Sequence, residues 1–342
     1  MTDLFHILET AVNAVVPVVL IVLLGYCLKQ SGFLSREFIK VGSKVSFRVA
    51  MPIMLFVNVY NIESFDVIQW DVVVYSTTTL LLIFVLGLVT TVFFTDDPKR
   101  KGAILQATFR SNNAIVGLSL ASVLGGDEAV AVAAVVSAFS LPVMNILAVI
   151  ALTIYVNDDG KKKIDITGIL KKIARNPLII AIVLGMICLL IRGLQQKLFG
   201  RVVFALNNQT KFLYNALSNI KSMASPYALL ILGGQFDFSS SKGMMKEIMV
   251  GTVWRVVLAP AIAIGGAVAL TLSGILDFGV NEFPSLIGLF GTPAAVSSAI
   301  MAGEMGNDEQ LATQLVVWSS IASIFTMFFT VCILMAAGFL AA

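Results

Sequence analysis

Two long apolar stretches of the sequence are each interrupted near the centre by residues that unwind a helix. The stretch 102–124 contains the run 110–113 (Arg-Ser-Asn-Asn), and the stretch 284–305 contains the run 291–293 (Gly-Thr-Pro). Asparagine and serine side chains compete for backbone hydrogen bonds and proline lacks a backbone donor, so both runs favour a broken helix. A half-helix that starts at such a break directs N–H groups at it, which favours an anion. A half-helix that ends there offers carbonyls to a cation or a ligand donor.

The composition places these breaks in a membrane. Of the 342 residues, 58% are hydrophobic and 13% are charged, against about 45–50% and about 25% in a soluble domain. This balance excludes a soluble enzyme, a disordered protein and a nucleic-acid binder. The single histidine, His6, excludes histidine-rich metal sites and Ser/His/Asp triads. We expect no catalytic residue, no metal and no cofactor.

The hydropathy pattern predicts an all-α integral membrane protein with ten transmembrane helices, since a spanning helix needs about 20 mostly apolar residues. The predicted spans are 8–28, 38–60, 71–95, 102–124, 129–156, 177–196, 208–236, 247–273, 284–305 and 309–340. Basic residues concentrate in alternate connections, above all in 157–176. The positive-inside rule therefore predicts a multi-pass protein of the cytoplasmic (inner) membrane with both termini outside and a cytoplasmic linker.

The two halves of the chain resemble each other. The nine residues from Pro17 (PVVLIVLLG) match those from Pro177 (PLIIAIVLG), and two further pairs of segments follow in the same order. Each half holds five predicted spans, an odd number, so the second half enters the membrane from the opposite side. The sequence thus predicts a five-plus-five inverted repeat, with 1–156 and 177–342 as the two repeats. This architecture is typical of secondary transporters.

The repeat superimposes the two breaks, with Asn112 on Pro293, and predicts that broken helices four and nine cross and form one site. Unsatisfied backbone groups are tolerated in a bilayer only against protein or a water-filled cavity. The residues predicted to bind a ligand are Arg110, Ser111, Asn112, Asn113, Thr292, Pro293 and Ala294. The residues predicted to shape the crossing or to gate it are Gly117, Gly291, Pro52 and Pro226.

Two arginines lie deep in the predicted spans. Arg110 is nine residues past Lys101 and Arg255 is nine residues past Lys246, which places each about 13 Å into the membrane. A deep arginine is costly and usually functional. Arg110 is therefore a ligand or gating charge, or else a structural partner of backbone carbonyls, and Arg255 is expected to be structural.

No aspartate or glutamate lies in the middle of a predicted span. Glu304 comes closest, at the cytoplasmic end of the ninth span. It is a candidate proton or cation ligand together with Ser297 and Ser298, and its alternative interpretation is a solvated acid at a helix end.

Several segments resemble the auxin efflux carrier family, including its bacterial members. The stretch 109–121 (FRSNNAIVGLSLA) is similar to the fourth-span signature of that family, and 293–313 is similar to its ninth-to-tenth-span segment. The stretches 51–56 and 226–234 fit the second and seventh spans. Ser111 and Ser119 stand where the family pattern has prolines.

The resemblance implies crossed fourth and ninth helices and an elevator-like movement of a transport domain against a scaffold. Plant members of the family export the auxin anion, and bacterial members are associated with malate and malonate transport. The resemblance also implies that Asn112 and the region of Pro293 contact the carboxylate of the substrate.

The sequence therefore predicts a secondary carrier of a small organic anion, such as malate, malonate or an auxin-like acid, driven without ATP. Proton or sodium coupling and a homodimer remain open. One alternative is a sodium-coupled symporter with the architecture of bile-acid carriers. Another is a membrane receptor that binds its ligand without transporting it.

Overall fold

The computed structural model describes residues 16–17, 20–61, 69–155, 171, 174–237, 241 and 243–340, with only the backbone described at 114–115, 119 and 127. Most of the predicted linker 157–176 lies outside the described residues, as do both chain ends. All regular secondary structure within the described ranges is helical.

The chain forms a series of helices interrupted by single π-helical turns, here labelled η. In the first half, a helix over Leu20–Gln30 precedes α2 (Arg36–Val45), η1 (Ser46–Ala50), α3 (Met51–Tyr60), α4 (Trp70–Phe94), α5 (Pro98–Phe109), η2 (Asn113–Gly117) and α6 (Leu118–Ile154). In the second half follow α8 (Pro177–Phe199), α9 (Leu206–Gln209), α10 (Lys211–Gln235), α11 (Met245–Val253), η4 (Trp254–Leu258), α12 (Ala259–Leu272), α13 (Glu282–Leu286), η5 (Ile287–Gly291), α14 (Ser297–Glu304) and α15 (Glu309–Ala336).

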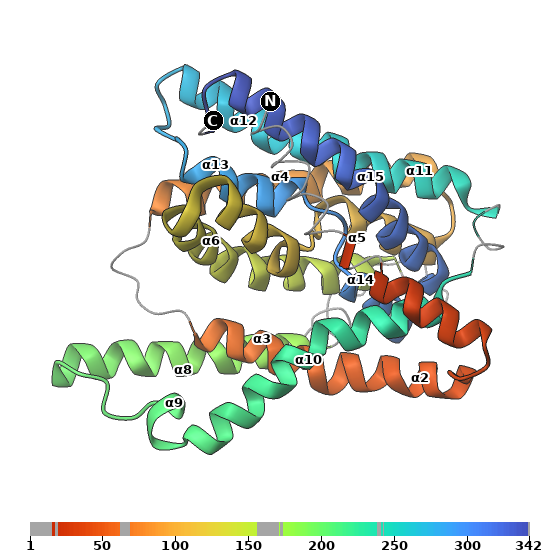
Figure 1. The fold of residues 1–342 in the computed structure, drawn as a ribbon, viewed down its shortest axis with the longest axis horizontal. Helices are drawn as coiled ribbons and strands as arrows, with labels where there is room; N and C mark the ends of the chain where they lie inside the picture. Colours follow the sequence, from red (N-terminus) through yellow and green to blue (C-terminus); the bar gives the residue numbers. More distant parts are fainter. Residues whose placement is uncertain are drawn as a thin grey trace.

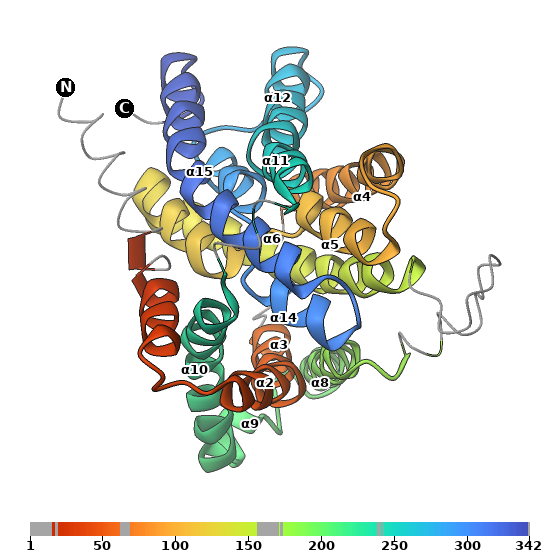
Figure 2. The same ribbon diagram turned by 90° about the vertical axis from the view of Figure 1, so that its right-hand side faces the viewer.

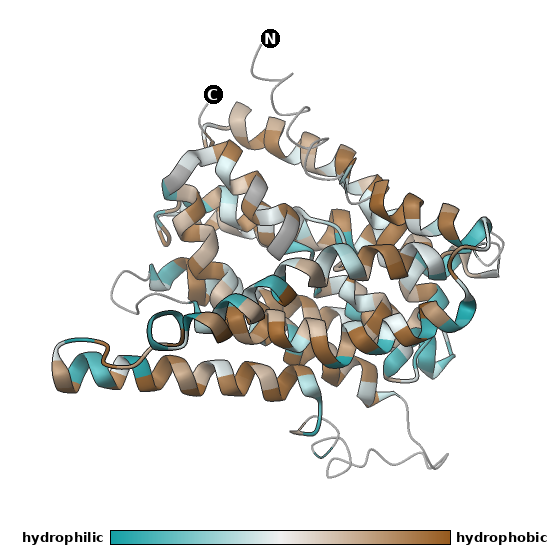
Figure 3. Cartoon of the chain, turned by 60° about the horizontal axis from the view of Figure 1, so that its bottom comes forward, coloured by the Kyte–Doolittle hydropathy of each residue, from teal (hydrophilic) through white to brown (hydrophobic). Residues whose placement is uncertain are grey.

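Five of the described helical segments are long and apolar enough to cross a membrane. They are Trp70–Phe94, Glu128–Ile154, Pro177–Phe199, Met245–Leu272 and Glu309–Ala336. In Figure 3, hydrophobic residues make up much of the helical ribbon, and many hydrophilic residues lie at helix ends and connections. The prediction of an all-helical, multi-pass membrane protein is confirmed. Helix also occupies described parts of the other five predicted ranges, while the crossing of the membrane by all ten stays a prediction.

Local sequence explains where several helices start. The side chain of Asp97 accepts a hydrogen bond from the backbone N–H of Lys99 at 2.9 Å, and Pro98 opens α5. Asp308 caps α15 in the same way, with its carboxylate 2.9 Å from the N–H of Leu311. Asp97 and Asp308 satisfy backbone donors that the first turn of a helix leaves free. Pro98 has no backbone N–H, so it adds no donor that needs a partner.

A glycine separates the fourth and fifth predicted spans. Gly126 lies inside the long α6 with a φ of 64° and a ψ of −154°. A positive φ is costly for residues with a Cβ atom, so glycine is the natural residue at this sharp change of direction. The kink divides the short half-helix that follows η2 from the spanning segment Glu128–Ile154.

The helices pack in two layers, visible in Figure 1 and again in the perpendicular view of Figure 2. The α3 layer contains α2, η1, α3, α8, α9 and α10, with the helix Leu20–Gln30 beside α10. The crossing layer contains α4 to α6 and α11 to α15, including their π-helical turns. Each layer draws helices from both halves of the chain. The candidate functional site lies where the two layers meet.

Candidate functional site

The two predicted breaks contact each other in the crossing layer. Helical structure stops at Phe109 and resumes at Asn113, and the second break separates Gly291 from Ser297. An isolated antiparallel bridge joins the two unwound segments, and the backbone N–H of Asn112 donates to the carbonyl of Pro293 at 2.8 Å. The sequence repeat had paired these same two residues.

Four helix ends therefore meet at one place. The carboxyl ends of α5 and η5 point their last carbonyls at the crossing, and the amino ends of η2 and α14 point their first N–H groups at it. Neither Asn112 nor Val296, which precede these two amino ends, makes a side-chain cap. Helix amino ends without a cap are natural positions for an anion.

A cavity of about 60 Å³ opens beside the crossing, between the two layers. This volume accommodates a carboxylate group or a few water molecules. The cavity is lined by Arg110, Ser111, Asn112, Ala295, Val296 and Ser297 at the breaks, by Leu141, Met144 and Asn145 of α6, by Met51, Met54, Leu55 and Asn58 of α3, and by Ala224, Ser225 and Ala228 of α10.

Asn112 presents a free donor in this cavity. Its side chain is 5% exposed, and its Nδ2 atom is buried without a hydrogen-bond partner. A buried donor without a partner carries a penalty of about 1–3 kcal/mol. A ligand with an acceptor oxygen would remove that penalty.

Arg110 contributes a positive charge on the same wall. It is 4% exposed, and its Nη2 donates to Oδ1 of Asn145 at 2.8 Å. The Gln106 amide is oriented so that both its nitrogen and its oxygen form hydrogen bonds. In this orientation Nη1 of Arg110 donates to the Gln106 oxygen at 2.9 Å. Both partners are neutral amides. Among the ion pairs formed by the described residues, none involves Arg110.

Arg255, which was expected to be structural, does not line this cavity. Its side chain is 0% exposed and donates to the carbonyls of Thr108 and Phe290. These carbonyls belong to the last turns of α5 and η5, so the arginine contacts helix ends and not the cavity.

Several predicted ligand residues support the crossing without lining the cavity. The Asn113 amide donates to Oγ of Ser137 at 2.7 Å, and the Thr292 hydroxyl donates to the carbonyl of Gly288 at 2.9 Å. The N–H of Ala294 is held by Ser319 at 3.1 Å. Pro293 contributes its backbone carbonyl to Asn112, as described above.

The predicted gating residues surround the same place. Gly117 lies against Gly288: a Cβ atom added at Gly117 would stand 2.8 Å from the Gly288 carbonyl oxygen. Pro52 and Pro226 follow the cavity residues Met51 and Ser225 directly in sequence.

The three candidates for ion coupling fall in different environments. Ser297 lines the cavity, and Oγ of Ser298 is buried without a partner. Glu304 lines a second cavity of about 470 Å³ between the layers, near Lys40 and Gln235, and its carboxylate lies 3.9 Å from Nε of Arg48.

Sequence reasoning missed Gln106, Asn145, Asn58 and Ser225. The signal for Asn58 and Asn145 was an isolated amide within an apolar run, MPIMLFVNVY and LPVMNILAVI. Gln106 contacts the cavity residue Arg110, and Ser225 lines the cavity itself. Only the fold identifies them as site residues, because the site forms from distant segments.

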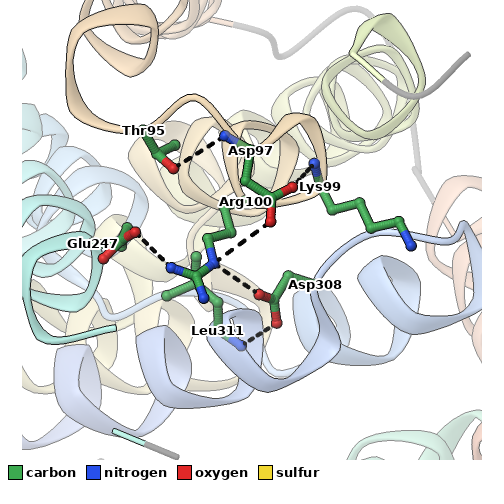
Figure 4. Close-up of polar contacts among 7 residues, drawn as sticks. All are labelled: Thr95, Asp97, Lys99, Arg100, Glu247, Asp308 and Leu311. Atoms are coloured by element: carbon green, nitrogen blue, oxygen red, sulfur yellow. Dashed lines mark hydrogen bonds and ion pairs between the residues drawn. The ribbon is translucent and has the colours of Figure 1, made fainter. Parts of the chain in front are cut away.

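A second polar cluster lies at the starts of α5, α11 and α15 (Figure 4). Nη1 of Arg100 lies 2.8 Å from Oε1 of Glu247, and Nε lies 3.3 Å from Asp308 and 3.7 Å from Asp97. The hydrogen bond to Glu247 is the main reason that the pKa of Arg100 is raised above its ordinary value. This cluster ties together three elements of the crossing layer.

Comparison with known proteins identifies the family of this chain. The pattern of a family described as membrane transport protein matches residues 10–331. An uncharacterized transporter of Methanocaldococcus jannaschii is 24% identical over 293 residues, which cover 84% of this chain and 87% of that protein. The chain therefore belongs to the membrane transport protein family, the family of the auxin efflux carriers.

Proposed function

We propose that this protein is a secondary carrier of a small organic anion, a mono- or dicarboxylate such as malate, malonate or an auxin-like acid. The observation that carries the proposal is the shared cavity wall of Arg110 and Asn112. In the part of the chain that the structure describes, a guanidinium without an acidic partner and a free amide donor face the same buried space. Membership in a transporter family favours a carrier over an enzyme.

The electrostatics of the site favour an anion. A charge buried in a membrane protein is costly unless it is paired. Among the described residues, the side-chain partners of Arg110 are neutral amides, and the amino ends of η2 and α14 add about half a positive charge each. A carboxylate in the cavity offsets these charges and accepts the hydrogen bond that Asn112 offers.

We infer an inverted-repeat topology from the same elements. The two crossing segments occupy equivalent positions in the two halves, and both are broken helices. The proposed arrangement has ten spans, both termini outside, and the cytoplasmic side at the Arg100 cluster. It resembles the general design of carriers whose site lies where two discontinuous helices meet.

The proposed transport cycle moves the crossing layer against the α3 layer. The cavity lies between the layers, so relative sliding would carry it from one side of the membrane to the other. The Arg100 cluster supports this movement as a rigid body because it joins three helix starts within the crossing layer. Contacts between the layers, such as Arg48 with Glu304 and Gln235 with Glu309, would break and reform.

Uptake into proteoliposomes tests the proposal. Labelled malate, malonate and indole-3-acetate would be offered with and without inward proton and sodium gradients. We expect saturable uptake of at least one anion, and loss of that uptake in Asn112→Ala. Asn113→Ala is the matched control, since its amide faces Ser137 and not the cavity. It should lower stability more than substrate affinity.

The other outcomes are equally informative. Absence of flux for every anion in folded, correctly reconstituted protein would contradict the anion assignment. Binding without flux would favour the receptor alternative, and strict sodium dependence would favour the symporter alternative. The oligomeric state is read in the same preparation by mass photometry.

A further inference from the structure

Arg255 occupies an unusual position for a membrane arginine. It is fully buried in η4, and it donates to carbonyls that belong to two different half-helices. Thr108 lies one residue before the end of α5, and Phe290 lies one residue before the end of η5. The guanidinium therefore bridges the carboxyl ends of both broken helices.

The charges of this group of atoms balance. Each helix carboxyl end carries about half a negative charge, because its last carbonyls lack helical donors. Two such ends converge here, and one guanidinium carries one positive charge. The described residues supply no carboxylate to Arg255 in any ion pair. The carbonyls thus take the place of an acidic partner.

We propose that Arg255 is a built-in cation for the carbonyl side of the crossing. Its guanidinium holds the place between two helix carboxyl ends that a bound monovalent cation would otherwise take. The proposed anion site, which Arg255 does not line, then works without a cation co-bound at these carbonyls. The consequence for transport rests on the proposed carrier function. The stability test below needs no substrate.

Removing the charge should expose a cation requirement. In Arg255→Met, which keeps an apolar side chain of similar length, two sets of carbonyls face each other without a donor. We expect a fall in Tm of roughly 5–10 °C in choline chloride. Sodium or guanidinium chloride at millimolar concentration should restore several degrees, at matched ionic strength, by occupying the vacated place. Arg255→Lys should retain most of the wild-type Tm.

Two controls separate this role from packing. The wild type should show no such cation response. Arg110→Gln removes another buried arginine whose described partners are side-chain amides and not helix-end carbonyls, so it too should show none. In proteoliposomes, wild-type uptake of a labelled anion should be equal in sodium and choline, and uptake by Arg255→Met should depend on the added cation.

The proposal is overturned if Arg255→Met is as stable as the wild type. It is also overturned if the Lys and Met variants are equally impaired with no response to cations, including failure of both to fold in every salt. Failure of all anions to be transported would leave the thermal-shift result intact, so the two proposals fail separately.

Discussion

At the scale of single residues, adjacent side chains with the same chemistry have different environments. Asn112 and Asn113 are neighbours, yet one amide faces the cavity and the other bonds to Ser137. The two deep arginines divide in the same way. Arg110 contacts side-chain amides on the cavity wall, and Arg255 contacts backbone carbonyls behind it. Position relative to the breaks, and not residue type, separates the residues that line the cavity from those that support it.

The partner of Arg110 provides a test at this scale. Asn145 accepts from Arg110 and donates to the carbonyl of Leu141 at 2.7 Å, so it orients the guanidinium. Asn145→Leu should raise the KM for the transported anion about tenfold, the value of one hydrogen bond to a charged group. Asn145→Asp should be worse, because its carboxylate competes with the substrate for Arg110. Initial uptake rates against concentration decide, and a milder effect of Asp than of Leu would count against an anionic substrate.

At the scale of elements, the crossing depends on close backbone contact between η2 and η5. A Cβ atom at Gly288 would stand 2.9 Å from Cα of Gly117. Backbone atoms at that distance cannot yield as a flexible side chain can. η2 follows the first break and η5 precedes the second. Contact between these two turns therefore sets the position of all four helix ends.

Glycine substitutions test this contact. Gly288→Ala should destabilise the protein by about 1–3 kcal/mol through overpacking and should reduce transport. Gly291→Ala is the matched control in the same turn, because its added Cβ would meet the nearest atom at 3.4 Å, an ordinary contact. Thermal unfolding and uptake would be measured for both. Equal effects of the two substitutions would mean that the Gly117 contact does not control the crossing.

At the scale of the whole molecule, the two layers differ in how they are held together. The crossing layer is tied at one end by the Arg100 cluster and at its centre by the crossing. The α3 layer has its own polar contact at the other end, where Nη1 of Arg192 donates to the carbonyl of Tyr60 at 2.6 Å. The small cavity between two such bodies is the geometry expected of relative sliding.

The Arg100 cluster predicts a salt-sensitive contribution to stability. Arg100→Ala leaves three carboxylates near one another and should lower the free energy of unfolding by about 1–3 kcal/mol. The raised pKa of Arg100 keeps it charged across the physiological range, so the loss should not vary there with its titration. Because the side chain is 28% exposed, high salt should reduce the difference from wild type. A salt-independent loss would indicate packing instead.

Cross-linking tests movement between the layers. In a cysteine-free background, Arg48→Cys with Glu304→Cys joins the α3 layer to the crossing layer through a short bismaleimide. Flux should stop while ligand binding persists. Glu128→Cys with Asn281→Cys is the control, since these side chains contact at 2.9 Å within the crossing layer. Undiminished flux in the first cross-linked pair would contradict sliding of the layers.

The sequence by itself determined the membrane class, the positions of both helix breaks and the pairing of Asn112 with Pro293. It also placed the start of the tenth span at 309, where α15 begins. These features depend on local composition and on backbone preferences of neighbouring residues, which are readable along the chain.

Only the tertiary structure decided which amide faces the cavity, what each arginine contacts and which helices form each layer. Arg255 meets Thr108 across 147 residues of sequence, and the direction of a side chain on unwound backbone follows no helical period. The cavity is lined by segments from five parts of the chain, so its polar groups become a set only when packing brings them together.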